Sequence, residues 1–268
     1  MARVEAPVGT TRSPLSIAAS LCAWAGYAFL VLPSLIVIPL SFGDRNELIF
    51  PPRSLSLFQY HKYFFESNWM AATWMSLRVA LATASLSLLI GVPAAYGLVR
   101  GEFPGKKVAT LFLLSPVLIP VIVVALGLYL YFASIGLRGG EIPLVLGHTL
   151  VATPFVIVTA MAGLRHVDAN LEAAGTIMGA GRLLVFRRIT LPLLRPAIVA
   201  GALFAFLISF DEVVIAYFIS RAGFATLPVK MYGSIQWEIS PVIAAVSTLL
   251  TILSLVVCLL VAAMQKDE

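Results

Sequence analysis

Six long apolar runs limit the folds that this chain of 268 residues can adopt. A helix needs about 20 apolar residues to cross the hydrocarbon core of a bilayer, and each run reaches that length. The chain is 60% hydrophobic and 12% charged, whereas soluble domains contain about 25% charged residues. We therefore predict an all-α membrane protein whose six transmembrane helices lie near Ser16–Phe42, Ala71–Val99, Val108–Ile135, Pro143–Leu164, Leu193–Ser220 and Ile239–Met264. Residues 1–15 and 265–268 are expected to be tails of one transmembrane domain at 16–264.

The positions of Lys and Arg predict which side of the membrane each loop occupies, because basic residues collect in cytoplasmic loops. Eleven of the 18 lie on the side that holds both termini: Arg3, Arg12, Arg100, Lys106, Lys107, Arg165, Arg182, Arg187, Arg188, Arg195 and Lys266. Six lie on the opposite side: Arg45, Arg53, Lys62, Arg138, Arg221 and Lys230. Arg78 falls inside the second run. Both termini and the long segment 165–192 are therefore predicted to be cytoplasmic. The net charge of +5 is explained by this topology, and no nucleic-acid partner is predicted.

The segment 165–192 (RHVDANLEAAGTIMGAGRLLVFRRITLP) is polar and glycine-marked, although apolar runs flank it on both sides. Asp168 is placed to cap the N-terminus of a helix. Residues at helical spacing predict one continuous stripe along that helix: Leu171, Ala174, Gly175 and Met178. Gly179-Ala180-Gly181 interrupts the helix. Thr190-Leu191-Pro192 is expected to end a second one, because the residue before proline avoids helical geometry. The segment suits contact with a partner protein, and a charged helix on the membrane surface is the alternative.

This segment resembles a signature of the inner-membrane permeases of binding-protein-dependent ABC importers, E-A-A-x3-G-x9-I-x-L-P. Gly179, Ile189, Leu191 and Pro192 match its spacing. When the signature is anchored on Gly179, its first triplet falls on 173–175, and the literal Glu172-Ala173-Ala174 lies one residue earlier. The similarity continues through residues 91–107, 146–168 and 206–250, and the last of these stretches is most similar to the spermidine/putrescine branch of the family.

The resemblance implies a type I ABC importer permease (MetI-like) fold in a bacterial inner membrane. Its implied partners are two copies of a cytoplasmic ATPase, a second permease subunit expected to be a different chain, a periplasmic binding protein and membrane lipid. The substrate is expected to be a small polar solute, first of all a polyamine such as putrescine or spermidine. The residues implied to couple the chain to the ATPase are Glu172, Ala173, Ala174, Gly175, Gly179, Ala180, Gly181, Arg182, Ile189, Leu191 and Pro192.

No catalytic residue, cofactor or metal site is predicted for the chain itself. The glycines of RGEFPGKK, Gly101 and Gly105, lack the spacing of a phosphate-binding loop, so ATP and Mg²⁺ are expected on the partner ATPase. The three histidines show no metal-ligand spacing. A single histidine in a membrane helix usually bonds a neighbouring helix, and we predict this role for His148.

Charged residues inside the predicted helices mark a candidate substrate pathway. Asp211, Glu212 and Arg78 lie deep in apolar runs, where an unpaired charge is costly and usually functional. One interpretation is an ion pair between Arg78 and one of the two acids. The other is attraction of a cationic substrate by at least one acid, aided by cation–π contacts to Tyr217 and Trp237.

Two local features complete the prediction for the membrane region. The loop before the second run is rich in aromatic residues, which predicts an interfacial helix near Ser56–Ser67 with Leu57, Tyr60 and Phe64 on its buried face. Proline predicts bends at Pro116, Pro120 and Pro154, either as passive kinks or as parts of a pathway.

Other functions remain open from the residues alone. Within the same family, iron, thiamine or an amino-acid derivative is an alternative substrate. From another class, a secondary transporter driven by an ion gradient has similar composition, although it needs no docking segment. An intramembrane serine protease is disfavoured because Ser115, Ser209 and Ser247 lack a glycine-framed nucleophile motif.

Overall fold

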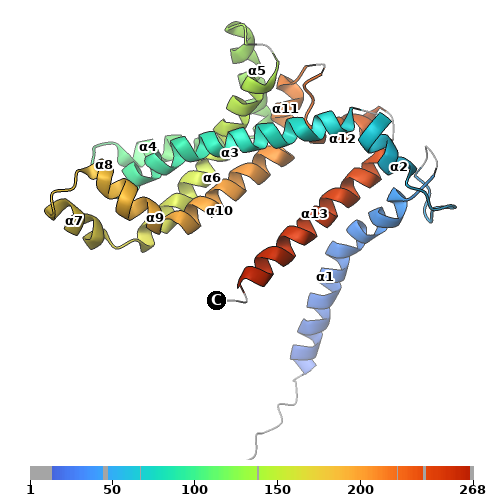
Figure 1. Ribbon diagram of the computed structural model, residues 1–268, viewed down its shortest axis with the longest axis horizontal. Helices are drawn as coiled ribbons and strands as arrows, with labels where there is room; N and C mark the ends of the chain where they lie inside the picture. Colours follow the sequence, from blue (N-terminus) through green and yellow to red (C-terminus); the bar gives the residue numbers. More distant parts are fainter. Residues whose placement is uncertain are drawn as a thin grey trace, which may run out of the picture. The chain divides into compact units, whose positions relative to one another are not determined.

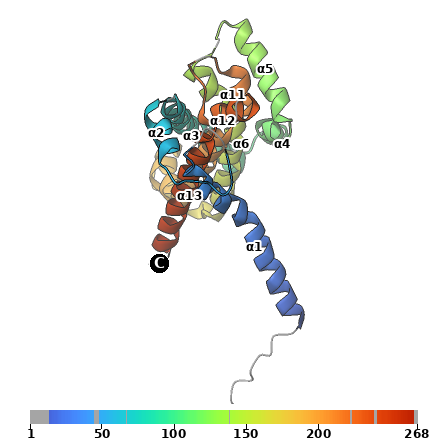
Figure 2. The ribbon, with the colours of Figure 1, turned by 90° about the vertical axis from the view of Figure 1, so that its right-hand side faces the viewer.

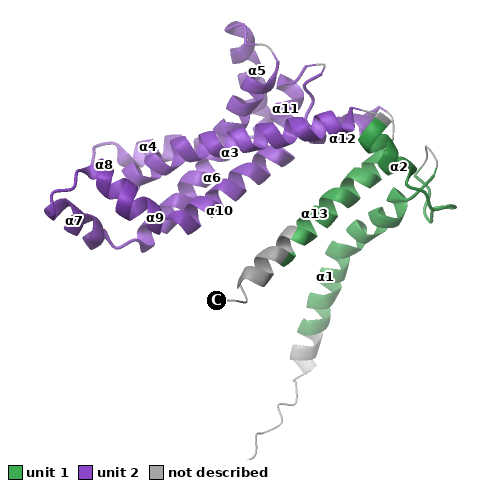
Figure 3. Cartoon of the chain, in the orientation of Figure 1, with its two compact units in different colours: residues 1–67, 239–268 green, residues 68–238 purple. Residues whose placement is uncertain are grey.

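The computed structural model describes residues 14–44, 48–66, 68–137, 139–221, 223–237 and 240–265, and these are almost entirely helical. The all-α prediction is therefore confirmed. The chain forms two compact units, one made of residues 1–67 and 239–268 and the other of residues 68–238 (Figure 3). The first and last apolar runs belong to the first unit, and the four middle runs build the second.

The first unit contains α1 (Pro14–Ser41), α2 (Phe58–His61), a π-helical turn at Lys62–Glu66 and α13 (Val242–Gln265). The α1 and α13 helices are in contact, and the Thr248 hydroxyl donates to the Val37 carbonyl at 3.5 Å. Most described side chains of α1 are exposed. Apolar surface of this extent suits lipid or another subunit.

The predicted interfacial helix is present only as α2 and the π-helical turn, and Ser67 lies outside the described residues. Its predicted buried face is wrong, because the buried residues are Gln59 and Tyr63, while Leu57 and Phe64 are exposed. The buried face is shifted by one residue toward the N-terminus, and it includes the Gln59 side chain, which donates to the Gly43 carbonyl at 3.5 Å.

The second unit contains most of the helices, and Figures 1 and 2 show it from two directions. Its longer elements are α3 (Trp69–Arg100), α4 (Lys106–Leu114), α5 (Val121–Ser134), α6 (Glu141–His166), α10 (Arg195–Asp211) and α12 (Leu227–Gln236). Its shorter elements are α7 (Ala169–Ile177), α8 (Arg182–Val185), a π-helical turn at Phe186–Thr190, α9 (Leu191–Leu193) and α11 (Val214–Ile219).

The core of this unit is the packing of α3, α6 and α10. Small residues allow the close approach, as is usual between membrane helices. A Cβ atom at Gly91 of α3 would lie 2.8 Å from a methyl group of Val156 on α6, and one at Gly201 of α10 would lie 2.8 Å from the Thr159 hydroxyl. The predicted role of His148 is confirmed, since its Nδ1 lies 2.8 Å from the Ser209 hydroxyl and joins α6 to α10.

Three described helices are long and apolar enough to cross a membrane unbroken, with spans at Ala19–Ser41, Trp69–Arg100 and Glu141–His166. Two bent pairs bring the number to five if each is one span. Residues 106–117 and 121–134 are bent by 96° relative to each other, and the prolines at 116 and 120 explain this predicted bend. By contrast, α6 continues as a single helix through Pro154.

The fifth predicted run is not one continuous helix. Residues 182–193 and 195–211 are bent by 76°. The chain then leaves the helix after Asp211 and resumes it at Val214. Asp211 and Glu212 therefore lie at a helix break, not within a helix as the sequence suggested.

Candidate functional site

The segment 165–192 folds as two short helical pieces joined by a tight turn, at one end of the second unit (Figure 1). The predicted cap is confirmed, because Asp168 Oδ1 accepts a hydrogen bond from the Asn170 amide at 2.9 Å. This bond satisfies one of the free N–H groups at the start of α7. The first piece of the segment therefore begins where its sequence indicates.

Gly179 ends α7 in a left-handed conformation with φ of +87°. The Gly179 amide donates to the Thr176 carbonyl at 3.0 Å, and the Ala180 amide donates to the Gly175 carbonyl at 3.1 Å. These two bonds define a Schellman motif, which requires positive φ at this position and so favours glycine. The backbone conformation therefore explains why the signature has glycine at this position. Side-chain crowding does not, because no atom lies within 4 Å of the position that a Cβ would occupy.

Gly175 brings α7 into close contact with the rest of the segment. A Cβ there would lie 2.7 Å from Cδ1 of Ile189 and 3.2 Å from Cγ2 of Val185. Val185 is buried, and Ile189 belongs to the family signature. The two pieces are therefore packed into a single unit, Ala169–Leu193, which we call the knob. Larger side chains at this contact would separate the two pieces.

Glu172 is the anchor of the knob. It is 9% exposed, and its carboxylate accepts hydrogen bonds from the Tyr96 hydroxyl at 3.3 Å, Arg100 Nε at 3.3 Å and the Thr190 hydroxyl at 3.0 Å. Arg100 also donates to the Val167 carbonyl at 2.7 Å. Because Tyr96 and Arg100 belong to the last turns of α3, these bonds fix the knob to the end of a core helix.

The exposed part of the knob is apolar. Ile177 is 87% exposed and Met178 is 81% exposed, and these two residues form the tip of the knob; Leu183 of α8 is exposed as well. Arg182, Arg187 and Arg188 of the second piece are also exposed. Methionine and arginine are among the residues enriched at protein–protein interfaces.

The predicted stripe contains one buried residue, Gly175, while Leu171, Ala174 and Met178 are exposed. The side of α7 that packs is set by the bonds to Glu172, which lies between the stripe positions. The predicted end of the segment at Pro192 was wrong, because Leu191 is helical, with φ of −62° and ψ of −42°. Pro192 is tolerated there because it occupies the first turn of α9, where its missing N–H is not needed.

Of the two interpretations of the charged residues, the structure contradicts the pairing of Arg78 with Asp211 or Glu212. Arg78 instead forms an ion pair with Glu141 at 3.5 Å, between α3 and the start of α6. Glu212 Oε1 accepts a hydrogen bond from the Ile215 amide at 2.9 Å and so caps α11. Asp211 is exposed and forms no hydrogen bond or ion pair with any described residue.

The aromatic candidates near this break have different surroundings. Tyr217 is half exposed and its ring meets that of Tyr232 edge to face at 5.7 Å. Trp237 is exposed and has no ring contact within the described part of the chain. The sequence did not point to Trp69, whose ring lies 5.0 Å from the Lys230 ammonium.

The sequence also did not predict the hydrogen bonds of Glu172, because its partners are distant in the chain. Tyr96, Arg100 and Thr190 lie 76, 72 and 18 residues away. The one available signal was Arg100, a basic residue at the end of an apolar run. Within the described ranges, no group of three or more His, Cys, Asp or Glu residues is arranged to hold a metal ion.

The long apolar helices and their packing define a helical membrane protein. A family model described as "Binding-protein-dependent transport system inner membrane component" matches residues 87–266, and the chain belongs to this family. It is a multi-pass inner-membrane permease subunit of an ABC importer and is not an enzyme itself.

Two curated relatives are named for polyamine transport. The spermidine/putrescine transport system permease protein PotC of Haemophilus influenzae is 31% identical over 87% of this chain and 91% of its own length. The putrescine transport system permease protein PotI of Escherichia coli is 32% identical over 84% of this chain and 82% of its own length.

Two solved structures share the fold. One is a bacterial ABC transporter that imports the acidic polysaccharide alginate, with a TM-score of 0.74, 14% identity and coverage of 98% of this chain and 99% of the other. The second is the MetNI methionine ABC transporter, with a TM-score of 0.61, 18% identity and coverage of 74% of this chain and 94% of the other. At these identities the similarity establishes the fold alone, and the predicted MetI-like permease architecture is confirmed.

Proposed function

We propose that this chain forms half of the translocation pathway of a polyamine importer and that the knob at Ala169–Leu193 transmits the ATPase cycle to it. The assembly comprises a second permease subunit, two copies of a cytoplasmic ATPase that hold ATP and Mg²⁺, and a periplasmic binding protein. The observation that carries the proposal is the knob itself, which is bound firmly to α3 through Glu172 and presents an exposed apolar tip.

The knob can transmit force because it is attached stiffly to α3. A load applied at Ile177 or Met178 reaches α3 through the bonds of Glu172 to Arg100 and Tyr96. The load then reaches α6 and α10 through close packing. Packed helices move as bodies and do not deform continuously. Closure of the ATPase subunits therefore moves the core helices and changes the side from which the pathway is open.

We propose six membrane spans with both termini in the cytoplasm. The two bent pairs each count as one span, and α13 supplies the sixth. The arrangement of cations supports this orientation: Arg100, Lys106 and Arg165 lie at the same end of the second unit as the knob. Basic residues gather on the cytoplasmic side of membrane proteins. The transmembrane domain then covers 16–264, with the coupling segment at 165–192 as an internal loop.

Polyamine is the proposed substrate because PotC and PotI are similar to this chain over most of its length. The helix break supports a cationic solute, because Asp211 is an exposed acid at the C-terminal, negative end of α10. Broken helices are common substrate sites in transporters. Tyr217 lies in α11, just beyond the break, and offers a ring face to an ammonium group.

The test is uptake of radiolabelled putrescine and spermidine into proteoliposomes that contain the complete transporter. We expect uptake that requires internal ATP and the binding protein and that does not respond to an ion gradient. Uptake by this chain alone, driven by a proton or sodium gradient, would contradict the importer assignment. ATP-dependent uptake of another solute in place of polyamine would contradict only the substrate.

A further inference from the structure

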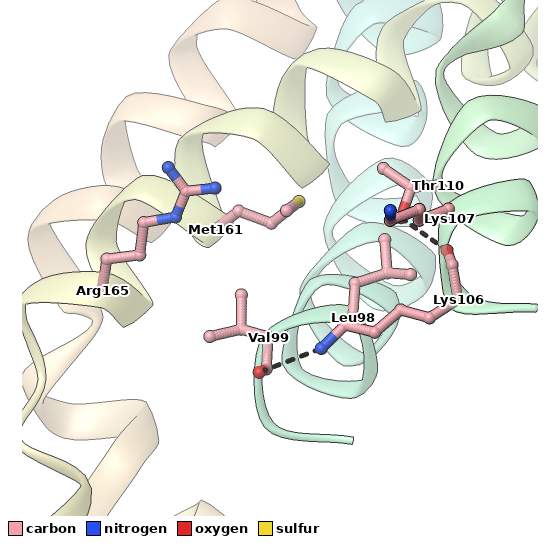
Figure 4. Close-up of a pocket in the computed structure, with 7 residues that line it drawn as sticks. All are labelled: Leu98, Val99, Lys106, Lys107, Thr110, Met161 and Arg165. Atoms are coloured by element: carbon pink, nitrogen blue, oxygen red, sulfur yellow. Dashed lines mark hydrogen bonds between the residues drawn. The ribbon is translucent and has the colours of Figure 1, made fainter. Parts of the chain in front are cut away.

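The second unit contains a hollow of about 480 Å³ between the ends of α3, α4 and α6 (Figure 4). Leu98 and Val99 of α3 and Met161 of α6 form its apolar walls, and Thr110 of α4 contributes to the same side as the lysines. Three cations complete the lining: Lys106, Lys107 and Arg165. The hollow therefore combines apolar walls with positive charge.

The positive charge of the hollow has no acidic partner among the described residues. Lys106 Nζ donates to the Gly101 carbonyl at 3.0 Å and to the Val99 carbonyl at 3.5 Å, so its ammonium is held beside the hollow. Lys107 and Arg165 are exposed. Glu172, the buried acid at this end of the unit, is already bound to Arg100. An anion that enters the hollow thus meets charge that is not neutralised by the protein.

The apolar walls of the hollow distinguish one kind of anion from another. Leu98, Val99 and Met161 line the same space as the three cations. A small inorganic anion gains nothing from such a surface. A molecule with an anionic head and a hydrocarbon tail uses both the cations and the apolar residues, because burial of apolar area is favourable.

We propose that the hollow binds an anionic phospholipid of the cytoplasmic leaflet. Lys106, Lys107 and Arg165 contact the phosphate, and the acyl chains lie along Leu98, Val99 and Met161. Basic pockets between membrane helices on the cytoplasmic side bind such headgroups. The inference rests on the proposed orientation. A lipid in this place joins α4 to α6 beside the anchor of the knob.

The test is native mass spectrometry of the full-length chain, purified in mild detergent and equilibrated with phosphatidylglycerol or phosphatidylcholine. We expect the wild-type chain to retain phosphatidylglycerol preferentially. In the double variant Lys107→Gln/Arg165→Gln the affinity should fall about 25-fold, the effect expected for two basic residues near an anionic lipid surface. The matched control is Arg187→Gln/Arg188→Gln, which removes the same charge from the exposed surface of the knob and should retain the lipid.

A second variant tests the shape of the hollow independently of its charge. Met161→Trp fills the hollow without removing a cation, and it should lose phosphatidylglycerol while its helical circular dichroism is unchanged. Equal retention of both lipids, or equal loss in the two charge variants, would overturn the proposal. Displacement of the lipid by millimolar inorganic phosphate would also overturn it, in favour of a soluble-anion site. Lipid retention is independent of uptake, so failure here and failure of the proposed function are distinguishable.

Discussion

The knob and the helix break both place acids near helix ends, but the acids are used in opposite ways. Glu172 is buried and receives three hydrogen bonds from two other elements. Asp211 is exposed and unpaired among the described residues, and Glu212 caps the next helix. An acid whose oxygens are occupied within the protein fixes structure, whereas an unoccupied acid remains available to a cation. From this comparison we propose that Glu172 positions the knob and that Asp211 attracts the substrate.

The largest expected effect is that of Glu172→Ala. The substitution leaves the largely buried Arg100 guanidinium without its acid and should destabilise the attachment of the knob by about 3 kcal/mol. We expect ATP-driven uptake and substrate-stimulated ATPase activity in proteoliposomes to fall more than about tenfold. Glu102→Ala, at an exposed acid in the loop after α3, is the control for charge alone. Normal coupling in the Glu172 variant would remove the distinction between the two regions.

Substitution of Gly179 should have the next largest effect. A left-handed conformation costs a residue with a Cβ about 1–2 kcal/mol. A β-branched residue there is strained further. Thermal unfolding should therefore show destabilisation that decreases from Gly179→Val to Gly179→Ala to Gly179→Asn. Gly181→Ala is the control, because Gly181 has φ of −66° and open space around it. Equal midpoints for all four variants would show that the cap contributes nothing to the knob.

A smaller and more selective effect is expected for Asp211→Asn. Loss of one exposed charge should raise the KM for polyamine about fivefold, since a unit charge near a cation in water contributes about 1 kcal/mol. Glu212→Gln retains an oxygen that can cap α11, so its change in KM should be smaller. The measurement is initial uptake rate against polyamine concentration. An unchanged KM in both variants would exclude these acids from the substrate pathway.

The smallest effect is expected at the ion pair between Arg78 and Glu141. Both side chains are partly exposed, and such pairs contribute about 0–1 kcal/mol. A double-mutant cycle with Arg78→Gln and Glu141→Gln, followed by thermal unfolding, should give a coupling energy within that range. A coupling energy above about 2 kcal/mol would show that the pair holds α3 and α6 together as strongly as the core does.

Local sequence signals predicted the features that depend on neighbouring residues. The cap at Asp168, the turn at Gly179 and the bend near Pro116 follow from side-chain or backbone properties of those residues themselves. The apolar runs likewise predicted the long helices, because length and composition suffice to define a membrane span. The predicted contact of His148 with another helix required no knowledge of its partner.

The errors in the predicted contacts of charged residues concern segments that are distant in the chain. The bond network of Glu172 and the pairing of Arg78 with Glu141 depend on how α3 and α6 align, which no local pattern encodes. The break after Asp211 was missed for a local reason: neither proline nor glycine lies between Ser209 and Ile215. The capping bond from Ile215 to Glu212 became evident only in the structure.

The central claim is that the knob is the point at which the ATPase acts on this chain. It is tested most directly by disulfide crosslinking from Met178→Cys, after Cys22 and Cys258 have been replaced by serine, to cysteines introduced on the ATPase. We predict a crosslink in membranes that strengthens or weakens when ATP is added, and none from Trp237→Cys. A transport-competent Met178→Cys chain that never crosslinks to the ATPase, or that reacts with an impermeant thiol reagent from outside the cell, would contradict the account.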